Sequence, residues 1–154
     1  MHQQSSLNKW SCLFDCFHYA FSINGSLTQE ALLQRIGHDG SKIMWKDYPE
    51  PLCRRSFHPQ EFVRVGLDLG FSVTCIEKYS YLAPDVKTVP FEIEWDISRY
   101  LQIYEGVLTG TCRTRAVRHA VFWHKTGYIF DPVGVCKNVD QFDIENFWVV
   151  EKIG

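Results

Sequence analysis

Two apolar segments joined by a short polar turn make up the stretch R-H-A-V-F-W-H-K-T-G-Y-I-F-D-P, Arg118 to Pro132. Such a pattern predicts a β-hairpin. With the turn centred on the K-T pair, His119 on the first strand faces Asp131 or the proline after it. Opposite residues of an antiparallel pair have Cβ atoms ~5 Å apart, so a carboxylate can hold an imidazole at this end of the hairpin.

Further strands are predicted on both sides of this hairpin. The segment F-S-V-T-C-I-E-K-Y, residues 71–79, alternates so that Phe71, Val73, Cys75 and Glu77 share one side. The segments G-V-L-T-G-T, residues 106–111, and N-F-W-V-V-E-K, residues 146–152, are also strand-like. Residues 95–104 are expected to form a short helix between them.

The first half of the chain has helical patterns. Helices are expected from Cys12 to Phe21 with Ser11 as N-cap, after Thr28 or Ser26, and from Pro59 to the residue before Gly70. Residues 38–57 have turn residues and no clean period, which indicates a long ordered loop. Helices followed by strands predict one α+β domain over residues 1–154, with N-terminal helices packed on a C-terminal antiparallel sheet.

Cys12 opens the first helix, where the helix dipole favours a thiolate. A free thiol has a pKa of ~8.5, so a nucleophilic cysteine needs an imidazole to take its proton and a third group to orient that imidazole. The His119–Asp131 pair supplies both. Cys16 lies one turn further into the helix, where packing in the core is the simpler interpretation.

The ordered set S-C-L-F-D-C-F-H-Y-A-F, R-H-A-V-F-W and Y-I-F-D-P-V-G resembles the papain-like cysteine peptidase superfamily. It is closest to the small bacterial branch that includes the bacteriocin-leader (double-glycine) processing peptidases. The resemblance spans residues 3 to about 134 and implies a papain-like fold. It implies Cys12 as nucleophile, His119 as general base and acid, and Asp131 as the orienting residue, with a peptide or protein as substrate and no cofactor or metal.

Two positions depart from the pattern of this family. Leu13 follows the nucleophile where the family has glycine, and Ser6 stands where the family often has the oxyanion-hole glutamine. An oxyanion hole needs a donor besides the backbone N–H of the nucleophile. Asn8 and Gln4 are the nearest candidates, and the sequence does not choose between them.

Polar and aromatic residues of the long loop are candidates for binding a substrate. His38 and Asp39 begin the loop, and Trp45 lies near its middle. A polar pair and an aromatic ring of this kind suit the wall of a peptide-binding groove.

Composition narrows the classes of function. The 154 residues are 45% hydrophobic. The formal net charge of −2 lacks the excess of basic residues that is typical of proteins that bind nucleic acid. No apolar run approaches the ~20 residues of a membrane helix, and no signal peptide is evident. A cytoplasmic protein, or one delivered from the cytoplasm by another route, with mostly reduced cysteines is therefore expected.

The sequence thus predicts a cysteine-dependent hydrolase, a peptidase or amidase that acts through a thioester. The same three residues also suit an acyltransferase or a deamidase. The alternative from a different class is a non-catalytic peptide- or protein-binding module on the same scaffold, in which the two departures are signs of lost activity. Zinc binding by Cys12, Cys16 and His18 is a further alternative, although C-x2-C spacing is absent from this segment. The oligomeric state stays open.

Overall fold

The structure is a computed structural model that describes residues 12–23, 25–50, 52–77, 97–114 and 117–153. Its helices are α2 (Cys12–Ser22), α3 (Gln29–Ile36), α4 (Pro59–Asp68) and α5 (Ser98–Ile103), with the 3-10 helix η2 (Val139–Gln141). Its strands are β1 (Phe71–Glu77), β2 (Gly106–Cys112), β3 (Val117–His124), β4 (Tyr128–Phe130) and β5 (Phe142–Lys152). The prediction of an α+β architecture is confirmed.

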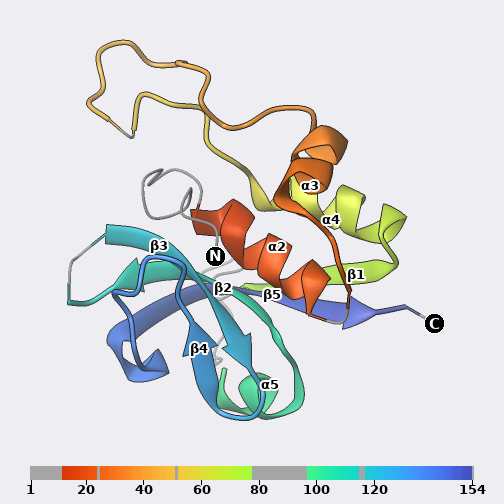
Figure 1. The fold of residues 1–154 in the computed structure, drawn as a ribbon. Helices are drawn as coiled ribbons and strands as arrows, with labels where there is room; N and C mark the ends of the chain where they lie inside the picture. Colours follow the sequence, from red (N-terminus) through yellow and green to blue (C-terminus); the bar gives the residue numbers. More distant parts are fainter. Residues whose placement is uncertain (1–11, 24, 51, 78–96, 115–116, 154) are drawn as a thin grey trace, which may run out of the picture.

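The five strands form one antiparallel sheet in the order β1-β5-β2-β3-β4. Helix α2 lies against β3 and β2, while α4 lies against β1 (Figure 1). The last strand of the chain, β5, therefore lies inside the sheet, between β1 and β2. This arrangement brings the beginning of α2 next to strands from the second half of the sequence.

The sheet is buried on both faces. Phe17 of α2 and Phe62 of α4 are both fully buried, and their rings stack with centroids 4.4 Å apart. Trp148 and Phe122 belong to this helix-covered core. The opposite face forms a second core with α5, which contains Leu101, Leu108, Val121, Trp123, Phe147 and Val149. Burial on both faces explains why β5 has the continuous apolar run F-W-V-V and not a clean alternation.

Local signals set the helix boundaries. Thr28 caps α3 by accepting a hydrogen bond from the N–H of Ala31 at 3.1 Å. Gly37 ends that helix in the left-handed conformation, with φ of 92°. Pro59 occupies the first turn of α4, after His58 as N-cap. The predicted cap of α2, Ser11, lies outside the described residues.

The register of the predicted hairpin was wrong. Phe122 pairs with Phe130 and His124 with Tyr128, so the turn contains three residues, 125–127, and not a central K-T pair. Gly127 adopts φ of 112° in this turn, a conformation that favours glycine. The ladder ends at Phe130, and Asp131 therefore follows the strand and does not face His119 across it.

Two other predicted boundaries change. Strand β5 begins at Phe142, four residues before the predicted start, because Phe142 and Ile144 are buried on one side while Asp143 points to solvent. Helix α5 is shorter than predicted and ends at Ile103. The beginning of that predicted helix, residues 95–96, lies outside the described residues.

Strand β2 requires a glycine where it crosses β5. The register between these strands shifts between Thr109 and Gly110, which indicates a β-bulge. A Cβ atom at Gly110 would lie 1.9 Å from the carbonyl oxygen of Asp143. The backbones of β2 and β5 therefore approach each other more closely than a side chain allows.

None of the described helices has the length and apolar character to cross a membrane.

Candidate functional site

Cys12 lies in the first turn of α2, and its side chain is half-buried. It lines a cleft together with His119 of β3. The first turn of a helix carries partial positive charge, which stabilises an anionic sulfur. The fold thus places this thiol at the helix end that suits thiolate chemistry.

The His119 side chain is only 7% exposed. Its Nε2 donates a hydrogen bond to Oδ1 of Asp131 over 2.7 Å. The Cys12 side chain also acts on this ring, because its interaction with the imidazole raises the pKa of His119. His119 therefore interacts with both Cys12 and Asp131, and it shares a cleft with Cys12.

Asp131 is held by its own loop. Its Oδ1 also accepts the backbone N–H of Val133 at 2.9 Å, and its Oδ2 accepts those of Val135 at 3.0 Å and Cys136 at 2.6 Å. Burial raises the pKa of the carboxyl group, but the hydrogen bonds from His119 and from the backbone outweigh it and lower the pKa. A carboxylate fixed in this way holds one tautomer and one orientation of the imidazole.

Opposing effects act on His119. Burial lowers the pKa of the imidazole, while the hydrogen bonds with Asp131 and Cys12 raise it, to about 9 in total. The ring is therefore protonated at neutral pH. A positive ring beside the sulfur is the environment in which reactive thiolates occur.

The cleft has a volume of about 610 Å³ and walls from several elements. Sequence reasoning missed most of them. Asn146 and Trp148 come from β5, Thr109 from β2, and Gln60 from α4. Leu52, Arg54, Ser56 and Phe57 from the loop before α4 add a further wall. The walls combine apolar surface with a small set of polar groups, as ligand sites commonly do.

One residue of this lining could have been found from the sequence. The alternation of β1 places Glu77 on a defined side of the strand, and Glu77 lines the cleft. The place of Asn146 depends on its pairing with Thr109 and Glu77 in neighbouring strands. That pairing involves the bulge in β5 and strands far apart in the sequence. No local pattern indicates it.

The proposed oxyanion donors Asn8 and Gln4 lie outside the described residues. Among the described residues of the cleft, Asn146 and Gln60 carry side-chain amides. The indole N–H of Trp148 already donates to Thr109 Oγ1 at 3.3 Å.

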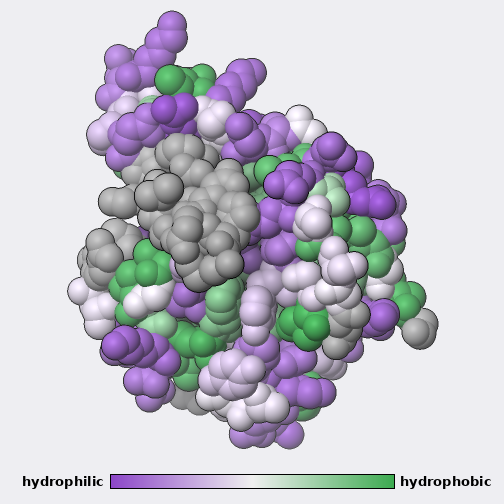
Figure 2. Space-filling model, in the orientation of Figure 1, coloured by the Kyte–Doolittle hydropathy of each residue, from purple (hydrophilic) through white to green (hydrophobic). Residues whose placement is uncertain are grey.

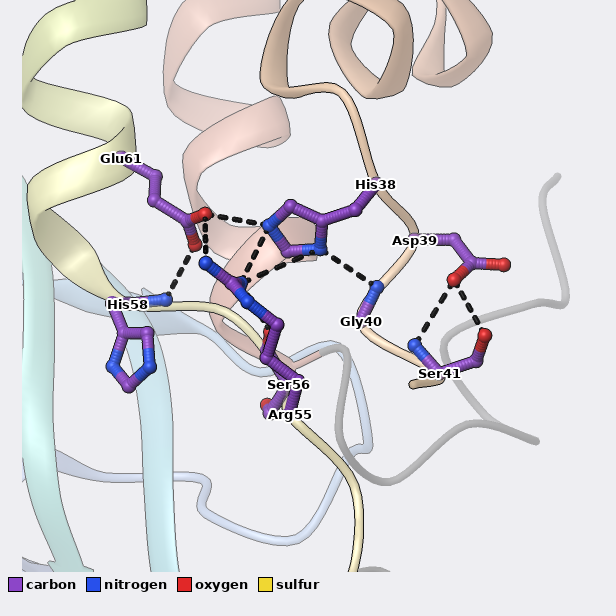
Figure 3. Close-up of polar contacts among 8 residues, drawn as sticks. All are labelled: His38, Asp39, Gly40, Ser41, Arg55, Ser56, His58 and Glu61. Carbon is purple, nitrogen blue, oxygen red and sulfur yellow. Dashed lines mark hydrogen bonds and ion pairs between the residues drawn. The ribbon is translucent and has the colours of Figure 1, made fainter. Parts of the chain in front are cut away.

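The structure does not bring His38, Asp39 and Trp45 to the lining of this cleft. Asp39 accepts hydrogen bonds from the N–H and hydroxyl of Ser41, at 3.0 and 2.6 Å, which hold its own turn (Figure 3). Trp45 is 48% exposed and stacks on Tyr48. The loop that carries them projects from the body in Figure 1, and its outer end in Figure 2 is mostly hydrophilic with a small hydrophobic area.

His38 belongs to a polar cluster that anchors this loop to α4. The N–H of Gly40 donates to its Nδ1 at 3.0 Å, and its Nε2 contacts both a carboxylate oxygen of Glu61 and, at 2.6 Å, Nη1 of Arg55 (Figure 3). Arg55 donates to the same carboxylate at 2.9 Å, and Glu61 also accepts the N–H of His58. The cluster fixes the loop where it enters the helix, directly beside the cleft wall.

Cys16 and His18 have partners elsewhere. Cys16 is fully buried in the core, and this burial raises the pKa of its thiol well above the usual value. The Nε2 of His18 lies 2.7 Å from the carbonyl oxygen of Leu27. Within the described part of the chain, no three histidine, cysteine or acidic side chains are grouped as a metal site requires.

Comparison of the chain with models of known protein families, with curated proteins and with solved structures gives no match.

Proposed function

We propose that this protein is a cysteine-dependent hydrolase of papain-like type that cleaves a peptide or another amide bond. One observation carries the proposal: His119 is hydrogen-bonded to Asp131, interacts electrostatically with Cys12, and lines the same cleft as Cys12. The position of the sulfur at a helix start supports it further.

The residues divide the reaction between them. Cys12 attacks the carbonyl carbon as a thiolate, with the thiol proton already held by the imidazolium of His119. The imidazolium then gives that proton to the leaving amine, and a thioester on Cys12 remains. Water, deprotonated by the same ring, attacks the thioester and releases the acid. Asp131 stays ionised throughout and stabilises the imidazolium.

The raised pKa of His119 suits the second proton transfer. A leaving amine needs a proton as the carbon–nitrogen bond breaks, and an imidazole with a pKa of about 9 carries one at neutral pH. The same raised pKa lowers the fraction of neutral ring at neutral pH, and this slows the later step, in which the ring must accept a proton from water.

The thiol reactivity of Cys12 provides the first test. The folded protein is treated with a small amount of iodoacetamide, and labelling of each cysteine is followed by mass spectrometry. Cys75 is the comparator within the molecule, because it is also half-buried but burial raises its pKa to about 11. We expect Cys12 to react at least ~10-fold faster than Cys75, and His119→Ala to remove most of this difference.

A matched variant separates the role of His119 from general disturbance of β3. His124 lies on the same strand and contacts Tyr19 at 2.8 Å, outside the cleft. His124→Ala is expected to leave the Cys12 labelling rate within about twofold of wild type. The hydrolase proposal fails if Cys12 is labelled no faster than Cys75 and if neither His119→Ala nor His124→Ala changes its labelling rate. A non-catalytic binding module is then the better interpretation.

Products distinguish the reactions that share this thioester. A peptidase releases two peptide fragments from a peptide library, a deamidase releases ammonia without chain cleavage, and a transferase joins the acyl group to an added amine. We expect fragments, and we expect Cys12→Ala to abolish them.

A further inference from the structure

Two buried cysteines meet on the face of the sheet opposite α2. Cys112 ends β2, and Cys136 lies in the segment after β4, 24 positions later. They are 0% and 3% exposed, and both belong to the core that contains Phe142 and Val121. Their Sγ atoms are 2.9 Å apart.

This separation is closer than unbonded sulfur atoms normally approach. A disulfide requires sulfur atoms ~2.05 Å apart and Cβ atoms whose directions converge. The backbone is held in place at both cysteines. Cys112 pairs with Val117 and Phe142 in the sheet, and the N–H of Cys136 donates to Asp131. The backbone therefore already holds the two side chains in a position from which a bond needs little movement.

We propose that Cys112 and Cys136 form a disulfide bond when the chain folds in the presence of a small-molecule disulfide such as oxidised glutathione. One protein thiol loses its proton and attacks a sulfur of oxidised glutathione, which releases one glutathione thiolate. The second protein thiol loses its proton and attacks the mixed disulfide, which releases the other. Two protein thiols are oxidised, and one glutathione disulfide is reduced to two thiols.

Burial decides when this bond forms. It raises the pKa of the Cys136 thiol to about 12, helped by the hydrogen bond with Cys112, so little thiolate is present in the folded protein. The exchange is therefore fast during folding or local opening and slow afterwards. The same burial shields the finished bond from reductants, so it acts as a structural link and not as a rapid switch.

The link would join two parts of the chain that carry the candidate site. Cys112 precedes the strand that bears His119, and Cys136 donates its N–H to the carboxylate of Asp131. The inference does not rest on the proposed function, because the bond would form equally in a protein whose Cys12 is inert.

Refolding in a glutathione redox buffer tests the inference. The protein is unfolded with reductant, refolded in a mixture of reduced and oxidised glutathione, alkylated in acid-quenched samples and digested with trypsin. Residues 100–113 and 126–137 form two tryptic peptides with one cysteine each. We expect these peptides to be linked in most molecules, with the other four cysteines alkylated.

The same mixture in denaturant provides the control, since an unfolded chain pairs its cysteines with little preference. If the linked peptide is no more abundant after refolding than in denaturant, or if both cysteines are alkylated in the refolded protein, the inference is overturned.

Thermal unfolding gives a second readout. Closing a loop of this size is expected to raise the Tm of the oxidised protein by about 5–10 °C over the reduced one. Cys53→Ser, which changes another buried cysteine, should keep this difference, and Cys112→Ser with Cys136→Ser should lose it. If the double variant does not fold, equal Tm values for oxidised and reduced Cys53→Ser still refute the link.

Discussion

The Nε2 of His119 lies 2.7 Å from Oδ1 of Asp131, and the two side chains are 7% and 3% exposed. The pair does not arise from the β-ladder, which ends at Phe130. It forms because the chain turns after β4, where three backbone N–H groups hold the carboxylate. The acid is thus oriented by contacts that do not involve the imidazole, which favours a fixed ring position.

Removing the charge at Asp131 is expected to release the proton of His119 at lower pH. In Asp131→Asn, the amide no longer stabilises the imidazolium, so the pKa of His119 should fall from about 9 toward the ordinary value. Titration of the His119 ring by NMR measures the change. Glu105→Gln is the control, because Glu105 acts on His124 and leaves His119 unchanged. An unshifted titration in Asp131→Asn would contradict this electrostatic role.

The stability of the protein should decrease between about pH 6.5 and pH 9. The pKa of His119 is raised from 6.5 in the unfolded chain to about 9 in the folded protein. The stability that the protonated ring contributes is therefore complete below pH 6.5 and is lost as the pH rises through 9. We expect a loss on the order of 2 kcal/mol in the free energy of unfolding by urea. His119→Gln should flatten this part of the curve. A slope of equal size in that variant would assign the effect to other groups.

The polar cluster at the start of α4 should make the protein sensitive to acid. Burial raises the pKa of Glu61, but the hydrogen bonds from Arg55, His58 and His38 outweigh it and lower the pKa to about 2. Its contribution is present above the unfolded value of 4.5 and is lost as pH falls toward 2.

Urea unfolding of Glu61→Gln between pH 5 and pH 2 measures this contribution. We expect the variant to lose on the order of 1 to 2 kcal/mol of unfolding free energy at pH 5, a modest value because solvent screens a partly exposed group. The loss should be smaller at lower pH, where Glu61 of the wild type becomes protonated. Glu50→Gln is the control, because Glu50 pairs with Arg54 at an exposed position and should cost little. Equal losses in the two variants would argue against a special role for Glu61.

A methyl group at Gly110 should destabilise the sheet strongly. The new Cβ would lie 1.9 Å from the carbonyl oxygen of Asp143, and both atoms belong to paired backbones that cannot separate without breaking hydrogen bonds. We expect Gly110→Ala to cost about 3 kcal/mol or more in the free energy of unfolding. Gly25→Ala, where no atom lies within 4 Å of the new Cβ, should change it by less than about 1 kcal/mol. A small effect at Gly110 would contradict the close approach of β2 and β5.

The order of helices and strands was predictable because it depends on local signals. Thr28, Gly37 and Pro59 set helix boundaries through backbone chemistry that acts within one turn. Alternation in β1 and the apolar strands around the hairpin indicated an antiparallel sheet, and the structure has one. The helix-then-strand order alone therefore determined the α+β class.

The sequence also singled out Cys12, His119 and Asp131 by chemical type and order, since an activated thiol requires a base and an orienting acid. Only the tertiary structure decided how they meet. The hairpin register depends on whether Gly127 takes a positive φ, and the pairing of Asn146 depends on a bulge between strands far apart in the chain. Contacts of that kind are set by packing and hydrogen bonds summed over the whole sheet, which no short stretch of sequence contains.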